Sequence, residues 1–261
     1  MKGVEIYGKM SVTLNLYKRH STPLRETFIE ENLSTYQDDE KIKHVNGFVC
    51  TFPASMCQLW MAFENKSIVF MPAHRYNLGR CTVQDWNLLN KQLKKMEFNE
   101  KDTIAAMSRY DLEYMKYYTG IEALLVPSYS GFYFNSVYNP QNVQKGSLLI
   151  FGHRKPYIID KVQQATKSKF QANFVYDLYQ RYEISDLLKH QAIIFFPYSV
   201  MSFKLTELYS LAIPLFMPSP QFFKNNGGLG HDRTSTSYPY CETDPQLEEK
   251  MRPKLNLHPR P

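Results

Sequence analysis

Short apolar runs that alternate with amphipathic segments constrain the fold of this chain more than any other feature. Several of the runs end at a proline, as at Pro53, Pro72, Pro127 and Pro197. Such runs are typical of strands buried on both faces, and strands that alternate with helices pair into a parallel sheet through right-handed βαβ units. The predicted strands comprise residues 47–52, 67–71, 103–107, 123–126, 147–151, 170–175, 192–196 and 214–217.

The segments between these runs predict helices with recognisable ends. Residues 82–96 carry an apolar stripe, and Thr82 stands where an N-cap is expected. Ser108 and Gly120 bound a second helix, because serine caps helix N-termini and glycine readily adopts the left-handed conformation that ends helices. Further helices are expected over residues 55–63, 156–166, 184–190 and 202–211.

The order of these elements predicts two domains. A looser segment rich in Tyr, Ser, Asn and Pro, residues 128–145, separates the first four apolar runs from the last four. We therefore expect an α/β fold with two tandem Rossmann-like parallel-sheet domains, residues 1–140 and 141–223. Residues 224–261 are rich in Gly, Asn and Pro and predict an irregular tail.

Composition excludes several classes of protein. The chain has 261 residues, of which 43% are hydrophobic and 21% charged, as in ordinary globular proteins. The net charge of +6 is spread over interleaved acids and bases, so no nucleic-acid partner is expected. No apolar stretch approaches the ~20 residues that span a membrane. Residues 1–16 alternate like a strand and have no apolar signal-peptide core.

The four cysteines show no metal-ligand spacing and no CxxC motif. Their even number permits disulfides without fixing the pairs. Cys50 lies inside an apolar run, which indicates a buried and inert sulfur. Two N-glycosylation triplets, at Asn32 and Asn65, matter only if the chain enters the secretory pathway.

A basic turn follows the predicted strand at residues 147–151. Gly152 allows a close backbone turn, His153, Arg154 and Lys155 follow, and Pro156 opens a helix. A helix N-terminus beside cationic side chains is a binding site for phosphate, and ligands of open parallel sheets bind beyond the carboxyl ends of the strands. The alternative interpretation is a solvated basic turn.

A second polar segment follows the predicted strand at residues 192–196. Ser199 or Ser202 is expected to cap the next helix, whose free N–H groups would then face a phosphate. Glu207, further along that helix, could accept hydrogen bonds from both hydroxyls of a ribose. The alternative is an ordinary capping serine and an exposed glutamate.

In the first domain a polar loop follows the strand at residues 67–71. His74 is a candidate general base, because its unperturbed pKa is near 6.5. Arg75 and Arg80 are candidates for binding an acidic acceptor or the leaving diphosphate. Asp111 is a competing base, although it could simply favour a helix N-terminus electrostatically. A structural loop, with His74 bonded to backbone, is the alternative.

Residues 190–219 resemble the donor-binding region of GT-B glycosyltransferases. In those enzymes a strand ends in a short polar loop, and the next helix carries a glutamate that binds the nucleotide ribose. The helix is followed by a short strand of the type small-apolar-Pro. Glu207, Ala212–Pro214 and Pro218–Ser219 stand in this order here. The two tandem α/β domains also resemble the GT-B plan.

This resemblance implies transfer of a sugar from a nucleotide-diphosphate-sugar donor to a hydroxyl of a glycan or glycoprotein acceptor. It implies no metal or other cofactor, because cationic side chains and helix N-termini can stabilise the leaving diphosphate. The implied site has three groups of residues. They are His153, Arg154, Lys155, Ser199, Ser202 and Glu207 on the donor side, His74 and Asp111 for catalysis, and Arg75 and Arg80 on the acceptor side.

Few strands precede residue 46, so the N-terminal domain is expected to lack part of the GT-B sheet. A membrane anchor upstream of Met1 would place the chain in the lumen of the ER or Golgi, and otherwise it would be cytoplasmic. Two rival functions stay open. One is a non-catalytic α/β protein that binds a sugar or nucleotide, and the other is a small hydrolase with Cys57 as nucleophile beside His74. The chain has no GxSxG, P-loop or HExxH motif.

Overall fold

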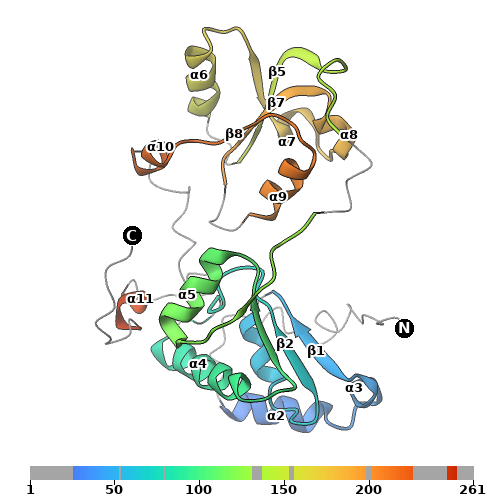
Figure 1. Cartoon of the computed structure of the whole chain (residues 1–261), viewed down its shortest axis with the longest axis vertical. Helices are drawn as coiled ribbons and strands as arrows, with labels where there is room; N and C mark the ends of the chain where they lie inside the picture. Colours follow the sequence, from blue (N-terminus) through green and yellow to red (C-terminus); the bar gives the residue numbers. More distant parts are fainter. Residues whose placement is uncertain are drawn as a thin grey trace. The chain divides into compact units, whose positions relative to one another are not determined.

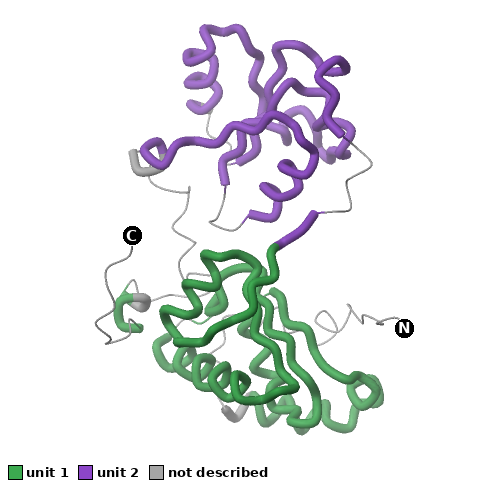
Figure 2. Tube along the Cα trace, viewed as in Figure 1, with its two compact units in different colours: residues 1–127, 235–261 green, residues 128–234 purple. Residues whose placement is uncertain are grey.

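The computed structural model describes residues 26–52, 54–78, 80, 82–130, 137–152, 156–197, 202–225 and 246–251. They belong to two compact units, residues 1–127 with 235–261 (unit 1) and residues 128–234 (unit 2) (Figure 2). The predicted domain boundary was residue 140, whereas the two units divide after Pro127. The strand expected within residues 1–16 lies outside the described residues.

Unit 1 contains a four-stranded parallel sheet in the order β1-β2-β3-β4, so strands that follow one another in sequence are also neighbours (Figure 1). Its strands are β1 (Gly47–Cys50), β2 (Ser67–Phe70), β3 (Thr103–Ala106) and β4 (Leu124–Leu125). Its helices are α2 (Glu26–Tyr36), α3 (Glu40–His44), the 3-10 helix η2 (Ala54–Leu59), α4 (Val83–Glu97) and α5 (Arg109–Thr119).

The ends of α4 and α5 follow from local sequence signals. The Thr82 hydroxyl accepts the Asp85 N–H at 3.1 Å, and the Ser108 hydroxyl accepts the Asp111 N–H at 3.1 Å. Gly120 ends α5 in the left-handed conformation, with φ of 73°. All three predicted helix boundaries are confirmed.

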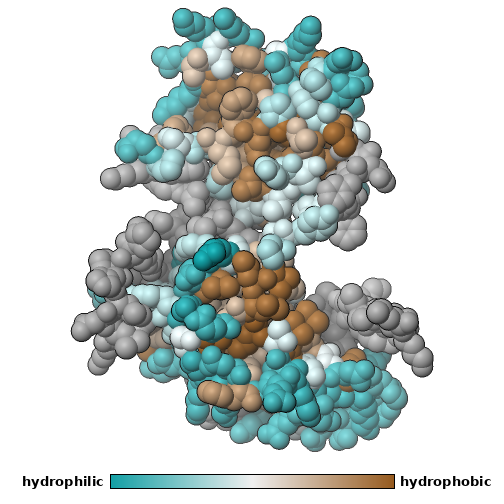
Figure 3. Space-filling view, in the orientation of Figure 1, coloured by the Kyte–Doolittle hydropathy of each residue, from teal (hydrophilic) through white to brown (hydrophobic). Residues whose placement is uncertain are grey.

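The core of unit 1 lies between one face of the sheet and α4 and α5. Side chains of Ile68 and Phe70 pack there against Trp86 and Leu89. Alternate residues point to the opposite face, where Val49 and Leu124 are 66% and 59% exposed. Figure 3 shows hydrophobic residues gathered on the visible face of each unit.

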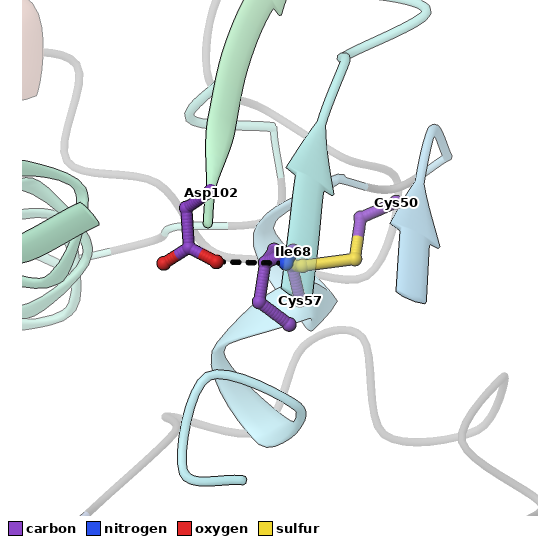
Figure 4. The surroundings of a disulfide bond; sticks show 4 residues. All are labelled: Cys50, Cys57, Ile68 and Asp102. Atoms are coloured by element: carbon purple, nitrogen blue, oxygen red, sulfur yellow. Dashed lines mark hydrogen bonds between the residues drawn. A yellow bond between two sulfur atoms is a disulfide. The ribbon is translucent and has the colours of Figure 1, made fainter. Parts of the chain in front are cut away.

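A disulfide joins Cys50, at the end of β1, to Cys57 in η2 (Figure 4). Nearby, the Asp102 carboxylate accepts the Ile68 N–H at 2.8 Å, which ties the turn before β3 to the start of β2. The disulfide fixes the segment between β1 and β2 against the sheet edge. The even number of cysteines allowed disulfides, but the sequence did not predict which cysteines pair.

Unit 2 contains a second four-stranded parallel sheet, in the order β6-β5-β7-β8. Its strands are β5 (Gln144–Phe151), β6 (Gln171–Phe174), β7 (His190–Phe195) and β8 (Leu215–Phe216). The chain passes from β5 outward to β6 and then returns to the other side of β5 to form β7. The direction of strand addition therefore reverses between β5 and β7.

Helices cover both faces of this sheet. The helices are α6 (Pro156–Ala165), α7 (Val175–Leu178), α8 (Ile184–Leu187) and α9 (Phe203–Ser210). Leu148 and Ile150 of β5 pack with Ile158 of α6. On the opposite face Leu149 packs with Leu208 of α9 and with residues of α7 and α8. Two four-stranded parallel sheets with packed helices confirm the predicted α/β class.

Two elements differ from the expectation. The predicted strand at residues 170–175 ends at Phe174, and Val175 begins the short helix α7. Beyond α10 (Pro220–Asn225), the tail expected to be irregular contains the helical turn α11 (Leu247–Lys250), and Met251 packs against the core of unit 1. Among the described helices, none combines the length and the apolar character that a membrane crossing needs.

Candidate functional site

The predicted donor segments of unit 2 follow β5 and β7, the two neighbouring strands between which strand addition reverses direction. Ligands of open parallel sheets bind outside the carboxyl ends of the strands at such a point. His153, Arg154, Lys155 and Ser199 follow these strand ends in sequence and lie outside the described residues.

Gly152 closes β5 in a conformation that only glycine adopts easily, with φ of 142°. A Cβ added there would lie 2.6 Å from the Cβ of Phe196, the residue that follows β7. The Phe196 N–H also donates to the Phe151 carbonyl at 2.8 Å. The backbones leaving β5 and β7 are therefore in direct contact, and glycine is required where the chain turns toward the N-terminus of α6.

Ser202 occupies the N-cap position of α9, as predicted, and its side chain is buried. Its hydroxyl makes no capping bond to the helix, so the expected side-chain cap is absent at this residue. The Ser202 carbonyl accepts the Leu205 N–H at 2.9 Å. The start of α9 is held by this backbone bond and by burial.

Glu207 is paired within its own helix. Its carboxylate forms an i,i+3 ion pair with the ammonium of Lys204, and both side chains are mostly buried. Nζ of Lys204 lies 5.2 Å from the ring centre of Tyr182 and 5.9 Å from that of Phe151. Burial alone would lower the pKa of Lys204, but hydrogen bonds to Glu207 and Tyr182 outweigh it and raise that pKa. The glutamate is therefore not the freely exposed residue of the alternative interpretation.

In unit 1 the structure brings the two candidate bases together. His74 follows β2 and Asp111 lies in the first turn of α5 after β3, at neighbouring carboxyl ends of the sheet. The His74 ring packs edge-on against Phe52, with centroids 5.2 Å apart. Burial lowers the pKa of His74, and the charge of Asp111 opposes this shift.

Asp111 is almost fully buried, with 4% of its surface exposed. Burial raises the pKa of its carboxyl group, against the effects of the Ser108 hydrogen bond and of the charges on His74 and Arg75. The Ser108 hydroxyl donates to Asp111 Oδ2 at 2.5 Å. The Asp111 carboxylate is thus held at the start of α5 by Ser108. Its negative charge raises the pKa of the neighbouring His74 imidazole, against the effect of burial.

Arg75 is held by aromatic rings of α5. Its Nη2 donates to the Tyr110 hydroxyl at 3.1 Å, and its guanidinium carbon lies 4.7 Å from the ring centre of Tyr114. These contacts place a cation near Asp111. Neither tyrosine was predicted to belong to the site, although their i,i+4 spacing on a predicted helix indicates that they share one face.

Arg80 is buried in the interior of unit 1. Only 1% of its surface is exposed, and its Nη1 donates to Oε1 of Gln58 in η2 at 3.1 Å. Arg80 was predicted, with Arg75, to bind an acidic acceptor or the leaving diphosphate, and the structure shows its side chain buried against Gln58. The physical reason is that Arg80 is held in the interior by its hydrogen bond to Gln58 of η2.

The disulfide removes one of the rival functions. Cys57 is 1% exposed and bonded to Cys50, so it has no thiolate to act as a nucleophile. Among the described residues, no three His, Cys, Asp or Glu side chains gather as metal ligands. Comparison of the chain with family models, curated proteins and solved structures gave no match.

Proposed function

We propose that this chain is a glycosyltransferase of the GT-B architecture, with two Rossmann-like domains. It transfers a sugar from a nucleotide-diphosphate-sugar donor to a hydroxyl of a glycan or glycoprotein acceptor. The observation that supports this proposal most strongly is the position of the donor segments. They follow β5 and β7, the point of unit 2 at which the strand order reverses and at which such sheets bind nucleotides.

On the donor side, Glu207 accepts hydrogen bonds from the ribose hydroxyls. Lys204 supports this role, because its ion pair with Glu207 restricts the orientation of the carboxylate. The diphosphate binds the N-terminus of α6 together with His153, Arg154 and Lys155. Gly152 supports this placement, because the backbone contact that it permits directs the chain into that helix.

On the acceptor side, His74 removes the proton from the acceptor hydroxyl. A lowered pKa keeps its imidazole neutral near pH 7, as a general base must be. The negative charge of Asp111 then stabilises the imidazolium that forms. Arg75, held against Tyr110 and Tyr114, binds an acidic acceptor or the leaving diphosphate. No metal takes part in this scheme.

The disulfide between Cys50 and Cys57 supports a place in the lumen of the secretory pathway. Cytosolic thiols are kept reduced, whereas disulfides persist in oxidising compartments. We therefore prefer this location to the cytoplasm.

The test is release of free nucleoside diphosphate from a panel of nucleotide-diphosphate sugars, with and without glycan acceptors. The proposal expects release with one class of donor, and a loss of release in Glu207→Gln. The matched control is Glu64→Gln, which changes an exposed glutamate in a turn of unit 1. Saturable donor binding without release would identify a non-catalytic binding protein instead, and failure to bind any donor would refute both functions.

A further inference from the structure

The turn Asn77–Arg80 in unit 1 buries polar groups that have no partner. Asn77 is 0% and Arg80 1% exposed. Within the part of the chain that the structure describes, Nδ2 and Oδ1 of Asn77 and Nε and Nη2 of Arg80 form no hydrogen bond. The Arg80 N–H donates to the Asn77 carbonyl at 2.9 Å, so the residues are the first and last of a β-turn. Their Cα atoms are therefore within about 7 Å of each other.

The surrounding side chains hold this turn in place. The Ser55 hydroxyl donates to the Leu78 carbonyl at 2.5 Å. Gln58 accepts from Arg80 Nη1 at 3.1 Å and donates to Gln92 of α4 at 2.7 Å. Nη1 of the Arg80 guanidinium is thus already bonded to Gln58. The remaining edge, Nε with Nη2, presents the two parallel N–H groups that bind an oxyanion in a bidentate manner.

Arg80 keeps its charge in this buried position. Burial lowers its pKa to about 10, against the effect of the negative charge on Asp85, so the guanidinium stays protonated at neutral pH. The Asp85 carboxylate accepts a hydrogen bond from the Thr82 hydroxyl, and Arg80 has no ion pair among the described residues. A buried charge with unmade hydrogen bonds is strongly unfavourable, so binding of a complementary anion is favoured.

We propose that the side chains of Asn77 and Arg80 bind an inorganic hydrogen phosphate ion. Its oxygens accept hydrogen bonds from Arg80 Nε, Arg80 Nη2 and Asn77 Nδ2, and its own O–H donates to Asn77 Oδ1. All four unpartnered atoms are then satisfied. Sulfate and acetate at neutral pH can accept these bonds but have no O–H to donate, so they leave Asn77 Oδ1 unpaired.

This phosphate site does not depend on the proposed transferase activity. His74 and Arg75, on the preceding part of the loop, contact Phe52, Tyr110 and Tyr114. Asn77–Arg80 instead contacts η2, which is linked to α4 through Gln92. The near-complete burial of both side chains favours a small free ion over the phosphate group of a larger molecule.

The experiment is a titration of the full chain with phosphate, after dialysis into phosphate-free buffer of constant ionic strength. Isothermal calorimetry measures the affinity, and a thermal scan measures the melting temperature. We expect saturable binding of phosphate and a rise in melting temperature. Sulfate, acetate and glycerol phosphate should bind at least about tenfold more weakly, a difference that corresponds to one lost hydrogen bond. Equal binding of all four anions, or no binding of phosphate, would overturn the proposal.

Variants locate the binding. Arg80→Lys keeps the charge but removes the bidentate edge, and Asn77→Asp keeps the shape but replaces the amide donor by a repelling charge. Each should weaken phosphate binding at least about tenfold. Arg109→Lys is the matched control, because it changes an exposed arginine of the same unit and should leave this binding unchanged. Arg154→Ala, in the proposed donor site, distinguishes binding there from binding at Asn77 and Arg80. If only Arg154→Ala abolishes phosphate binding, the ion binds the donor site and the proposal for Asn77–Arg80 is wrong. Circular dichroism checks that each variant is folded.

Discussion

Gly152 and Phe196 lie so close that a Cβ on the glycine would be 2.6 Å from the Cβ of the phenylalanine. They follow β5 and β7, which are hydrogen-bonded neighbours in the sheet of unit 2. This contact brings together the backbone where the chain leaves β5 and where it leaves β7. The geometry of that edge of the sheet therefore depends on the absence of a side chain at residue 152.

Gly152→Ala should destabilise unit 2 by about 1–3 kcal/mol, because alanine rarely adopts a φ of 142° and its Cβ would collide with Phe196. Urea unfolding measures the loss. Gly146→Ala is the control, because Gly146 also has a positive φ, of 78°, but a Cβ there would be 3.6 Å from its nearest neighbour. A Gly152→Ala chain that is no less stable than Gly146→Ala would show that the close contact is not maintained in solution.

His74→Gln should lower kcat by about 10²–10⁴ and leave donor affinity unchanged, because a general base acts on the acceptor hydroxyl. In the wild-type chain kcat/KM should fall as the pH drops below about 6.5, since burial lowers the pKa of His74 and only the neutral ring accepts a proton. Steady-state kinetics and donor titration on one preparation provide kcat and the donor affinity. Equal losses of kcat, donor affinity and melting temperature would indicate a purely structural loop.

His190 should make stability depend on pH. The Ser147 hydroxyl lies 2.6 Å from its Nδ1 and the Tyr179 hydroxyl 2.8 Å from its Nε2. Burial and the charge of Lys189 lower the pKa of His190, against the charge of Asp186. The unfolded chain then binds more protons in mild acid, so the free energy of unfolding should decrease as the pH falls below about 6.5.

Urea unfolding at pH 5.5 and 7.5, two values chosen on either side of about 6.5, checks this dependence on His190. His190→Gln should reduce the difference in stability between the two values and cost about 1–3 kcal/mol at the higher one, because buried hydrogen bonds are lost. His44→Gln is the control, since that side chain is 82% exposed. The interpretation fails if both variants keep the full pH dependence.

Of the two glycosylation triplets, only Asn65 should accept a glycan. Nδ2 of Asn32, the atom that would be modified, donates to the Leu59 carbonyl at 3.1 Å, and the residue is 5% exposed. Asn65 is exposed in the turn before β2. Expression with an added secretion signal, followed by glycosidase treatment, should show one mobility shift that Asn65→Gln removes. A shift that survives in Asn65→Gln but not in Asn32→Gln would contradict the packing of α2 on η2.

Elements with local signals could be predicted from the sequence. Thr82, Ser108 and Gly120 mark helix ends through bonds and backbone conformations that involve only nearby residues. The helix α7 was missed because Val175 continues an apolar run and is fully buried, and burial alone does not distinguish a strand from a single helical turn.

The sequence could predict neighbouring site residues only where the strand order of the sheet places them together. Strand order places His74 and Asp111 at neighbouring strand ends, and both were predicted as candidate bases. The burial of Arg80 depends on Gln58 and Gln92, which are distant in sequence, and the Cys50–Cys57 pair depends on how η2 packs against β1. Contacts of this kind come from tertiary packing, so residue type and spacing did not reveal them.

The most direct test of the proposed function is the affinity of Glu207→Gln for nucleoside diphosphates. Loss of a hydrogen bond to a charged carboxylate costs about 1.5–3 kcal/mol, a decrease in affinity of roughly tenfold or more. Calorimetric titration of wild-type and variant chains should therefore show saturable binding of one nucleoside diphosphate, weakened to this extent by the substitution. Absence of binding to the wild-type chain, or equal affinity in the two chains, would contradict the assignment of the donor site to the β5–β7 edge.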